Sequence, residues 1–170
     1  MRWKDDPARA LLLSLYAKAD ELVRDATCAC TAPGDLDAEG AADLEQRAPC
    51  CHFAVTGREP YPTAVELTEV LHAARARGIR TRPVARRLPV VKEADTARRC
   101  PLLSEDARCT IYASRPLGCR TFFCDRGDGP PRRAREGLLE IARRIADLSA
   151  KVSPRDPRPR PLLGALKRVL

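Results

Sequence analysis

The sequence predicts an α+β fold that is mainly helical, with three helices and a short β hairpin around irregular loops that carry cysteines. Three stretches place apolar residues at helical spacing, two short runs are rich in β-type residues, and most cysteines fall in or beside turns. The chain has 170 residues, of which 44% are hydrophobic and only 4% aromatic. We therefore expect one domain with a small core, of the kind that often needs a metal or a covalent staple.

Three segments carry helix signals. The first covers residues 7–26, where Asp6 can cap the helix and a proline occupies the favourable first position. The second covers residues 63–78, where the initial threonine and Glu66 form a capping box and the final glycine stops the helix. The third covers roughly residues 133–151 and has a continuous apolar stripe.

The remaining segments predict the rest of the organisation. Residues 87–95 and 108–112 are β-type runs that we expect to pair as a short hairpin. Residues 31–49 are polar and acidic and are bounded by glycine and proline, which predicts a loop insert. We expect a single domain over residues 1–152, followed by a proline-rich basic C-terminal tail over residues 153–170.

The net charge of +8 is unevenly distributed, because basic residues gather in 75–87 and 151–170. Such runs can neutralise the phosphates of nucleic acid. They are more typical of a solvated surface in an arginine-rich protein. A zinc-stabilised nucleic-acid-binding module that uses these two runs is therefore an alternative function, and nucleic acid is not the favoured partner.

The N-terminal segment bears on the compartment. An apolar run over residues 10–17 is followed by an A-x-A pattern, but Asp5 and Asp6 occupy the region that a signal peptide keeps positive. No apolar run approaches the roughly 18 residues that a membrane span requires. We therefore expect a cytoplasmic protein without a membrane partner. In a reducing cytoplasm, eight cysteines favour metal binding over disulfides.

The position of the cysteines also favours metal ligation. Seven of the eight lie in or beside turns, and only Cys109 starts a β-type run. Cysteines that serve as packing residues tend to lie on the apolar faces of regular elements instead. The best predicted metal ligands are Cys50, Cys51, Cys109, Cys119 and Cys124, with Cys100 next and Cys28 and Cys30 last.

The spacing leaves the metal open. Cys119 and Cys124 form the only pair with zinc-knuckle spacing, and the usual iron–sulfur runs are absent. The vicinal pair Cys50–Cys51 can reach one metal only if the backbone turns sharply, because neighbouring side chains of an extended chain point to opposite faces. Otherwise the pair serves a cluster or two sites, or it forms a vicinal disulfide or a redox-active thiol pair. His52, which follows the pair, is a further candidate ligand.

Arginines accompany the cysteines. Arg115 and Arg120 flank Cys119 in the sequence. A metal held by several thiolates carries excess negative charge, and burying that charge is costly without cations nearby. We therefore expect these two guanidinium groups to compensate the charge of the sulfurs.

Four segments resemble the YkgJ-like cysteine-cluster family, namely CCHF (50–53), RRCPLL (98–103), RCTIYASRP (108–116) and GCRTFFC (118–124). Members are described as zinc- or iron-chelating proteins with a C-x-x-C-x-x-C-C motif. The specific part of the resemblance is C-P-x-L followed by C-x-I-Y-x-x-R-P-x-x-C-R, which this chain carries. The resemblance spans roughly residues 28–124. It departs from the motif at the front, where residues 31–49 look like an insertion.

The resemblance implies a bacterial protein that holds zinc or an iron–sulfur cluster as its cofactor. Its role would be structural, electron-transfer or metal-handling, and a protein partner is compatible with each. Some larger relatives are flagellin lysine methylases, so an enzymatic role would be redox chemistry or support of a methyltransferase-type system. Gly127 and Gly129 lie outside any strand–helix context typical of a cofactor loop, which favours a non-enzymatic function.

Overall fold

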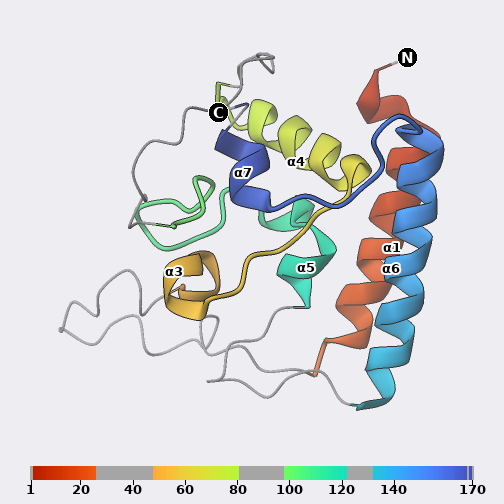
Figure 1. The fold of residues 1–170 in the computed structure, drawn as a ribbon, viewed down its shortest axis with the longest axis horizontal. Helices are drawn as coiled ribbons and strands as arrows, with labels where there is room; N and C mark the ends of the chain where they lie inside the picture. Colours follow the sequence, from red (N-terminus) through yellow and green to blue (C-terminus); the bar gives the residue numbers. More distant parts are fainter. Residues whose placement is uncertain (1, 26–47, 81–97, 122–131, 168, 170) are drawn as a thin grey trace.

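The computed structural model describes residues 2–25, 48–80, 98–121, 132–167 and 169. Figure 1 shows two long helices side by side and antiparallel, with the shorter helices gathered beside them. The helices of the described part are α1 (Pro7–Leu22), α3 (Phe53–Thr56), α4 (Ala64–Ala76), α5 (Leu117–Arg120), α6 (Arg132–Val152) and α7 (Leu162–Lys167). Its 3₁₀ turns are η1 (Trp3–Asp5), η3 (Pro49–Cys51) and η4 (Tyr112–Ser114).

The three predicted helices are confirmed as α1, α4 and α6, and their ends follow from local chemistry. The Asp6 carboxylate accepts a hydrogen bond from the Ala8 amide at 2.9 Å and caps α1. The capping box of α4 is formed, with the Thr63 amide donating to the Glu66 carboxylate at 2.8 Å. After α4, Gly78 adopts a φ of 76°, the left-handed conformation that favours glycine and ends the helix.

The α+β prediction is wrong, because no strand forms within the described ranges. The first half of the expected hairpin, residues 87–95, lies outside the described residues. In the second half, Cys109 makes only an isolated antiparallel bridge with Leu103. The chain turns tightly between these two residues, with Ala107 at a φ of 57°, and then enters η4. The β-type residues of 108–112 are thus used in a local turn.

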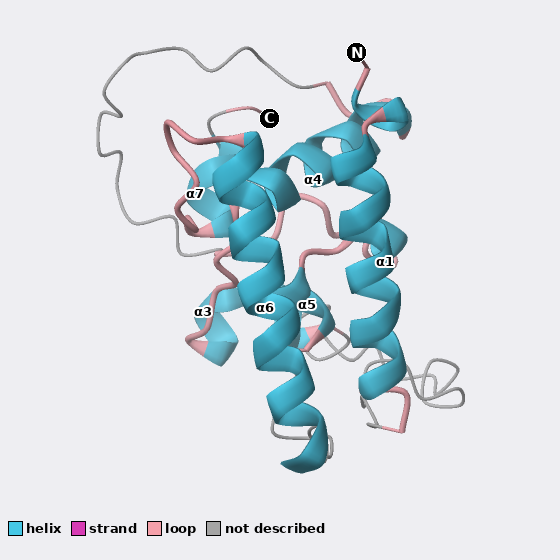
Figure 2. Cartoon of the chain, turned by 90° about the vertical axis from the view of Figure 1, so that its right-hand side faces the viewer, coloured by secondary structure: helices cyan, strands magenta, loops and turns pink. Residues whose placement is uncertain are grey.

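The described core consists of two clusters. The first, which we call the helix-pair cluster, joins α1 to α6 and consists of Leu12, Leu15, Tyr16, Ala19, Val65, Leu138, Ile141, Ile145 and Leu148. The second, which we call the cysteine-side cluster, lies around α4 and α7 and consists of Ala48, Phe53, Val70, Ala74, Cys100, Leu102, Leu103, Ile111, Leu162, Leu163 and Leu166. Figure 2 shows the helices that frame the two clusters from a second side. Every other described cysteine whose packing is given, namely Cys51, Cys109 and Cys119, packs against the cysteine-side cluster.

The C-terminal segment returns to this cluster. After α6 the chain runs beside residues 60–62, where the amides of Arg160 and Leu162 donate to the carbonyls of Pro62 and Pro60 at 3.1 and 3.0 Å. It then forms α7, whose three leucines are at most 7% exposed. Leu162, Leu163 and Leu166 of this segment are therefore part of the cysteine-side cluster.

Candidate metal centre

Five of the eight cysteines lie in the described residues, where they come from three separate segments. Cys50 and Cys51 form part of η3, Cys100 and Cys109 flank the tight turn, and Cys119 lies in α5. These five cysteines are thiols and not halves of disulfides. The other three predicted ligands, Cys28, Cys30 and Cys124, lie outside the described residues.

A short backbone pairing brings the first two segments together. The Phe53 amide donates to the Arg98 carbonyl, and the Cys100 amide donates to the Cys51 carbonyl, both at 2.8 Å. These bonds frame an antiparallel bridge between His52 and Arg99. Because successive side chains alternate between faces, Cys51 and Cys100 share one face of the bridge and His52 lies on the other.

The vicinal pair is compatible with one metal ion. The sulfurs of Cys50 and Cys51 are 4.0 Å apart, well beyond the roughly 2.05 Å of a disulfide bond. Two sulfurs on one tetrahedral zinc, each about 2.3 Å from the ion, are about 3.8 Å apart. The 3₁₀ turn at Pro49–Cys51 supplies the sharp change of direction that lets neighbouring side chains approach.

The thiols of all three segments interact electrostatically. The pKa of Cys100 is raised to about 11, mainly by burial, and the negative charge of the Cys109 and Cys50 thiolates contributes to this rise. Burial also raises the pKa of Cys119, as do the thiolates of Cys100, Cys109 and Cys50. Four cysteines separated by up to 69 positions in the sequence (Cys50 to Cys119) therefore share one electrostatic environment.

The thiols lie in one region of the fold but do not form a coordination site. In the described ranges, no three His, Cys, Asp or Glu side chains are arranged to hold a metal ion. Their chemistry nevertheless fits a soft cation. Each of these thiolates would make its neighbours harder to deprotonate, and a bound metal ion is the charge that reverses this effect. The donor set of sulfurs without carboxylates is typical of zinc and iron–sulfur sites.

Arginines stabilise the segment that carries Cys119. The Arg120 side chain is 3% exposed and donates to the carbonyls of Arg115 (2.8 Å) and Ala113 and to the Asp20 carboxylate (2.5 Å). Its guanidinium also lies 4.2 Å from the centre of the Tyr16 ring. Arg120 therefore ties the Cys119 helix to α1.

The charge of these arginines also reaches the sulfurs, as the sequence predicted. Although burial raises the pKa of Cys109, the guanidinium groups of Arg115 and Arg120 lower it. Arg115 stacks on the Tyr112 ring at 3.7 Å, and its buried Nε has no hydrogen-bond partner in the described part of the chain. Its positive charge acts on the thiols of both Cys109 and Cys119 and lowers their pKa values against the effect of burial.

Replacing Arg120 tests its structural role. We expect Arg120→Met to lower the free energy of unfolding by about 2–4 kcal/mol, because two carbonyls and a carboxylate lose a buried charged donor. The matched control is Arg143→Met, which removes an arginine that is 75% exposed and pairs loosely with Glu140, and should change stability by less than about 0.5 kcal/mol. Urea denaturation measures both. Equal midpoints for the two variants would contradict the role of Arg120.

Two glutamates of α4 hold the same segment from the other side, and the sequence did not identify them as site-building residues. Glu66 accepts hydrogen bonds from the Leu117 amide at 2.8 Å and from the Tyr16 hydroxyl at 3.3 Å. Glu69, which is 0% exposed, accepts from Trp3 (2.8 Å), Arg9 (2.7 and 3.1 Å) and Ser114 (2.9 Å). Their buried positions could have been suspected from the sequence, because both glutamates lie on the face of α4 that carries the buried valines.

A close backbone contact fixes α5. A Cβ added at Gly118 would lie 3.1 Å from Cβ of Pro60, which is tighter than ordinary contact. The absence of a side chain at Gly118 therefore lets α5, with the adjacent Cys119, approach residues 60–62. This explains why glycine precedes the cysteine in the GCR motif.

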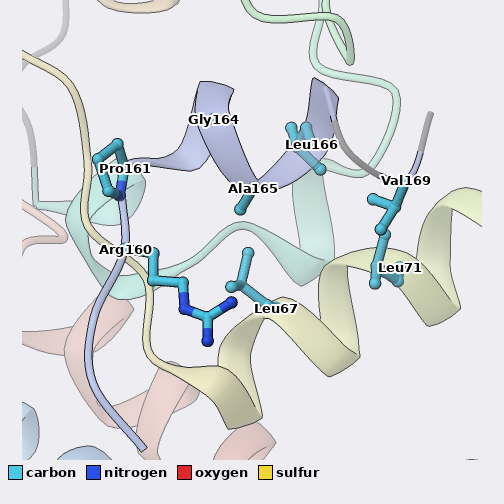
Figure 3. A pocket seen from close by; sticks show the side chains of 8 residues that line it. All are labelled: Leu67, Leu71, Arg160, Pro161, Gly164, Ala165, Leu166 and Val169. Carbon is cyan, nitrogen blue, oxygen red and sulfur yellow. The ribbon is translucent and has the colours of Figure 1, made fainter. Parts of the chain in front are cut away.

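A pocket of about 420 Å³ that no described cysteine lines lies between α4 and α7 (Figure 3). Its lining residues are Leu67, Leu71, Arg160, Pro161, Gly164, Ala165, Leu166 and Val169. A Cβ added at Gly164 would meet nothing within 4 Å. The packing of α7 against α4 is therefore incomplete on this side.

The two basic runs are only partly described. Residues 81–87 of the first run lie outside the described residues, as does Arg168 of the second. In the second run, Arg160 forms an ion pair with Asp156. Among the helices that the structure describes, none has the length and apolar character needed to cross a membrane.

A helical protein that gathers buried and half-buried thiols from distant segments has the donor chemistry of a thiolate metal-binding protein. Comparison with known families specifies the kind. Residues 45–134 match the family model "CxxCxxCC: Putative zinc- or iron-chelating domain", and because the match covers more than half of the chain, the protein belongs to this family. No curated protein and no solved structure matches the chain. The match includes six cysteines and leaves out Cys28 and Cys30.

Proposed function

We propose that this chain holds zinc or an iron–sulfur cluster through cysteine thiolates, and that the metal has a structural role. The observation that carries the proposal is that cysteines from three separate segments, Cys51, Cys100, Cys109 and Cys119, pack in or against one cluster. The negative charges of Cys50, Cys100 and Cys109 also act on the thiol of Cys119. Bound metal would crosslink the three segments that carry these residues. Membership of a zinc- or iron-chelating family supports the same chemistry.

Burial favours the structural role over electron transfer or metal delivery. Cys100 is 6% exposed and belongs to the cysteine-side cluster, and three other cysteines pack against that cluster. An unfolded chain has no preformed site, so the free energy of metal binding contributes directly to folding. A metal held here stabilises the one cluster that has no long helix pair to support it.

The proposed ligands follow from position. Cys50, Cys100, Cys109 and Cys119 form the central set, and Cys51 adds a sulfur close to that of Cys50. Cys124 is a further ligand, since it follows Cys119 at zinc-knuckle spacing and lies within the family match. Cys28 and Cys30 are the weakest proposals because they precede that match.

The first experiment identifies the metal. The protein is purified without oxygen, and its absorption spectrum is recorded while iron, zinc and acid-labile sulfide are measured per chain. A brown protein with equal iron and sulfide would indicate an iron–sulfur cluster, and a colourless protein with stoichiometric zinc would indicate a zinc site. A protein with neither metal and with all thiols open to alkylation would refute the proposal.

Serine substitutions then rank the ligands. We expect Cys119→Ser and Cys50→Ser to lose most of the bound metal, because each removes a sulfur from the central set. Cys28→Ser is the matched control and should retain it. Metal content per chain, measured after gel filtration, gives the answer. Full metal content in Cys119→Ser would remove that residue from the site.

A further inference from the structure

The segment over residues 59–62 contacts both the C-terminal segment and α5, the helix that carries Cys119. On one side it accepts hydrogen bonds from the amides of Arg160 and Leu162. On the other side Pro60 lies against Gly118 of α5, next to Cys119. A change in the docking of the C-terminal segment can therefore reach Cys119, a proposed ligand, through residues 60–62 alone.

Glu59 adds a second connection. One of its carboxylate oxygens accepts a hydrogen bond from the Leu163 amide of α7 at 2.5 Å, and the other accepts from the Arg98 guanidinium at 2.8 Å. The Glu59 side chain is only 9% exposed. The backbone carbonyl of Arg98 in turn accepts a hydrogen bond from the Phe53 amide, in the backbone pairing that brings Cys51 beside Cys100. One largely buried carboxylate thus links α7 to that pairing.

Packing couples the same elements. Leu162, Leu163 and Leu166 of α7 belong to the cysteine-side cluster together with Cys100. The family match ends at residue 134, so α7 lies outside the region that defines the family. The chain therefore closes its cysteine core with a segment that follows the family domain.

We propose that Glu59 is a positioning residue for the metal centre, and that the docking of α7 through Glu59 sets how fast the centre releases its metal. This inference rests on the proposed metal-binding function. It adds a control element, α7, that begins 43 residues after Cys119, the last of the described cysteines.

The physical basis is local opening. A buried ion leaves only when its surroundings open, and such openings begin in the least stable parts of a fold. A six-residue helix such as α7 is marginal without its tertiary contacts. It also has an interior glycine, and the pocket beside it leaves one side unfilled. The stability of its docking should therefore limit the opening of the cysteine core.

Two substitutions shift this docking in opposite directions. Glu59→Gln removes the charge that Arg98 and the Leu163 amide share, and should accelerate metal release about 10-fold. Gly164→Ala adds a methyl group in open space and favours the helical state, so it should slow release roughly 3- to 5-fold. The second variant does not weaken folding, so its result remains informative if the first variant folds poorly.

The measurement is the rate at which zinc-loaded full-length protein transfers Zn²⁺ to an excess of a chromogenic chelator. The control is Ile145→Val in the helix-pair cluster, which lowers global stability by removing one buried methyl group but leaves α7 intact. We expect its release rate to stay within twofold of the wild type, so a purely global effect of Glu59 would be recognised.

The outcomes separate the two proposals. Opposite shifts in release, with normal zinc content at the start, would support the role of Glu59 and α7. Normal zinc content with unchanged release in both variants would overturn this inference and leave the metal-binding proposal intact. A wild-type protein that holds no metal would overturn the metal-binding proposal and this inference with it.

Discussion

Removal of the metal by a chelator is expected to disorder the cysteine-side cluster while leaving the α1–α6 pair folded. The metal would join three segments that otherwise meet through short bridges, turns and the packing of the cysteine-side cluster, and structural zinc sites contribute on the order of 10 kcal/mol to folding. The helix-pair cluster contains no cysteine among its members. The two clusters should therefore respond differently.

Hydrogen exchange followed by mass spectrometry can resolve this difference. Peptides from residues 98–121 should lose protection in the metal-free protein, whereas peptides from α1 and α6 should keep most of it. Adding Zn²⁺ to the reduced protein should restore protection, and adding Mg²⁺ should not, because thiolates are poor ligands for magnesium. Equal protection of both regions with and without metal would contradict a structural role.

Glu69→Gln is expected to lower the free energy of unfolding by about 2–4 kcal/mol at pH 7. The wild-type carboxylate is fully buried and pairs with Arg9, and loss of one partner of such a pair leaves the other without compensation. The substitution also replaces one of the two carboxylate oxygens that accept hydrogen bonds from Trp3 and Ser114. Glu140→Gln, at an exposed site on α6, is the control and should have an effect below about 0.5 kcal/mol.

The effect of Glu69→Gln should depend on pH. Burial alone would raise the pKa of Glu69, but hydrogen bonds from Arg9, Trp3 and Ser114 outweigh it and hold the pKa below its ordinary value. A carboxylate with a lowered pKa stabilises the folded state above the pKa of the unfolded chain, and loses this effect as pH falls through the folded value.

Urea denaturation from pH 7 down to pH 3 tests this dependence. The gap between wild type and Glu69→Gln should be largest near neutrality and should narrow below about pH 4.5. Acid also releases metal from thiolates, but it does so in both proteins, so their difference isolates Glu69. A gap that is constant over this range would assign the effect to packing instead of charge.

The main helices could be predicted from the sequence because their signals are local. Asp6, the Thr63–Glu66 capping box and Gly78 each act within a few residues, and the apolar stripes of α1 and α6 repeat over several turns. The hairpin prediction failed because Ala107 turns the chain in a left-handed conformation without a glycine or asparagine to signal it. Cys109 then pairs with nearby Leu103.

The candidate site shows the same division between local and tertiary information. The cysteines could be proposed as ligands from their turn positions and from the family resemblance, and this stays a prediction. The supporting roles of Glu59, Glu66 and Glu69 could not be predicted. A carboxylate on a helix or loop is usually exposed, and only the fold shows which donors surround it. Helix α7 was missed since the proline-rich run before it is typical of a linker, whereas here that run pairs with residues 60–62.

The antiparallel pairing of α1 and α6 has a consequence for how the chain tolerates change. Gly137 near the start of α6 lies so close to Leu22 at the end of α1 that a Cβ there would be 2.8 Å from the leucine side chain. The long excursion between the two helices therefore leaves and returns at nearly the same point. Loop-closure entropy rises only with the logarithm of length, so segments added within the excursion burden the helical hairpin little. We therefore expect the α1–α6 pair to keep its packing when the segment between the two helices is lengthened or shortened.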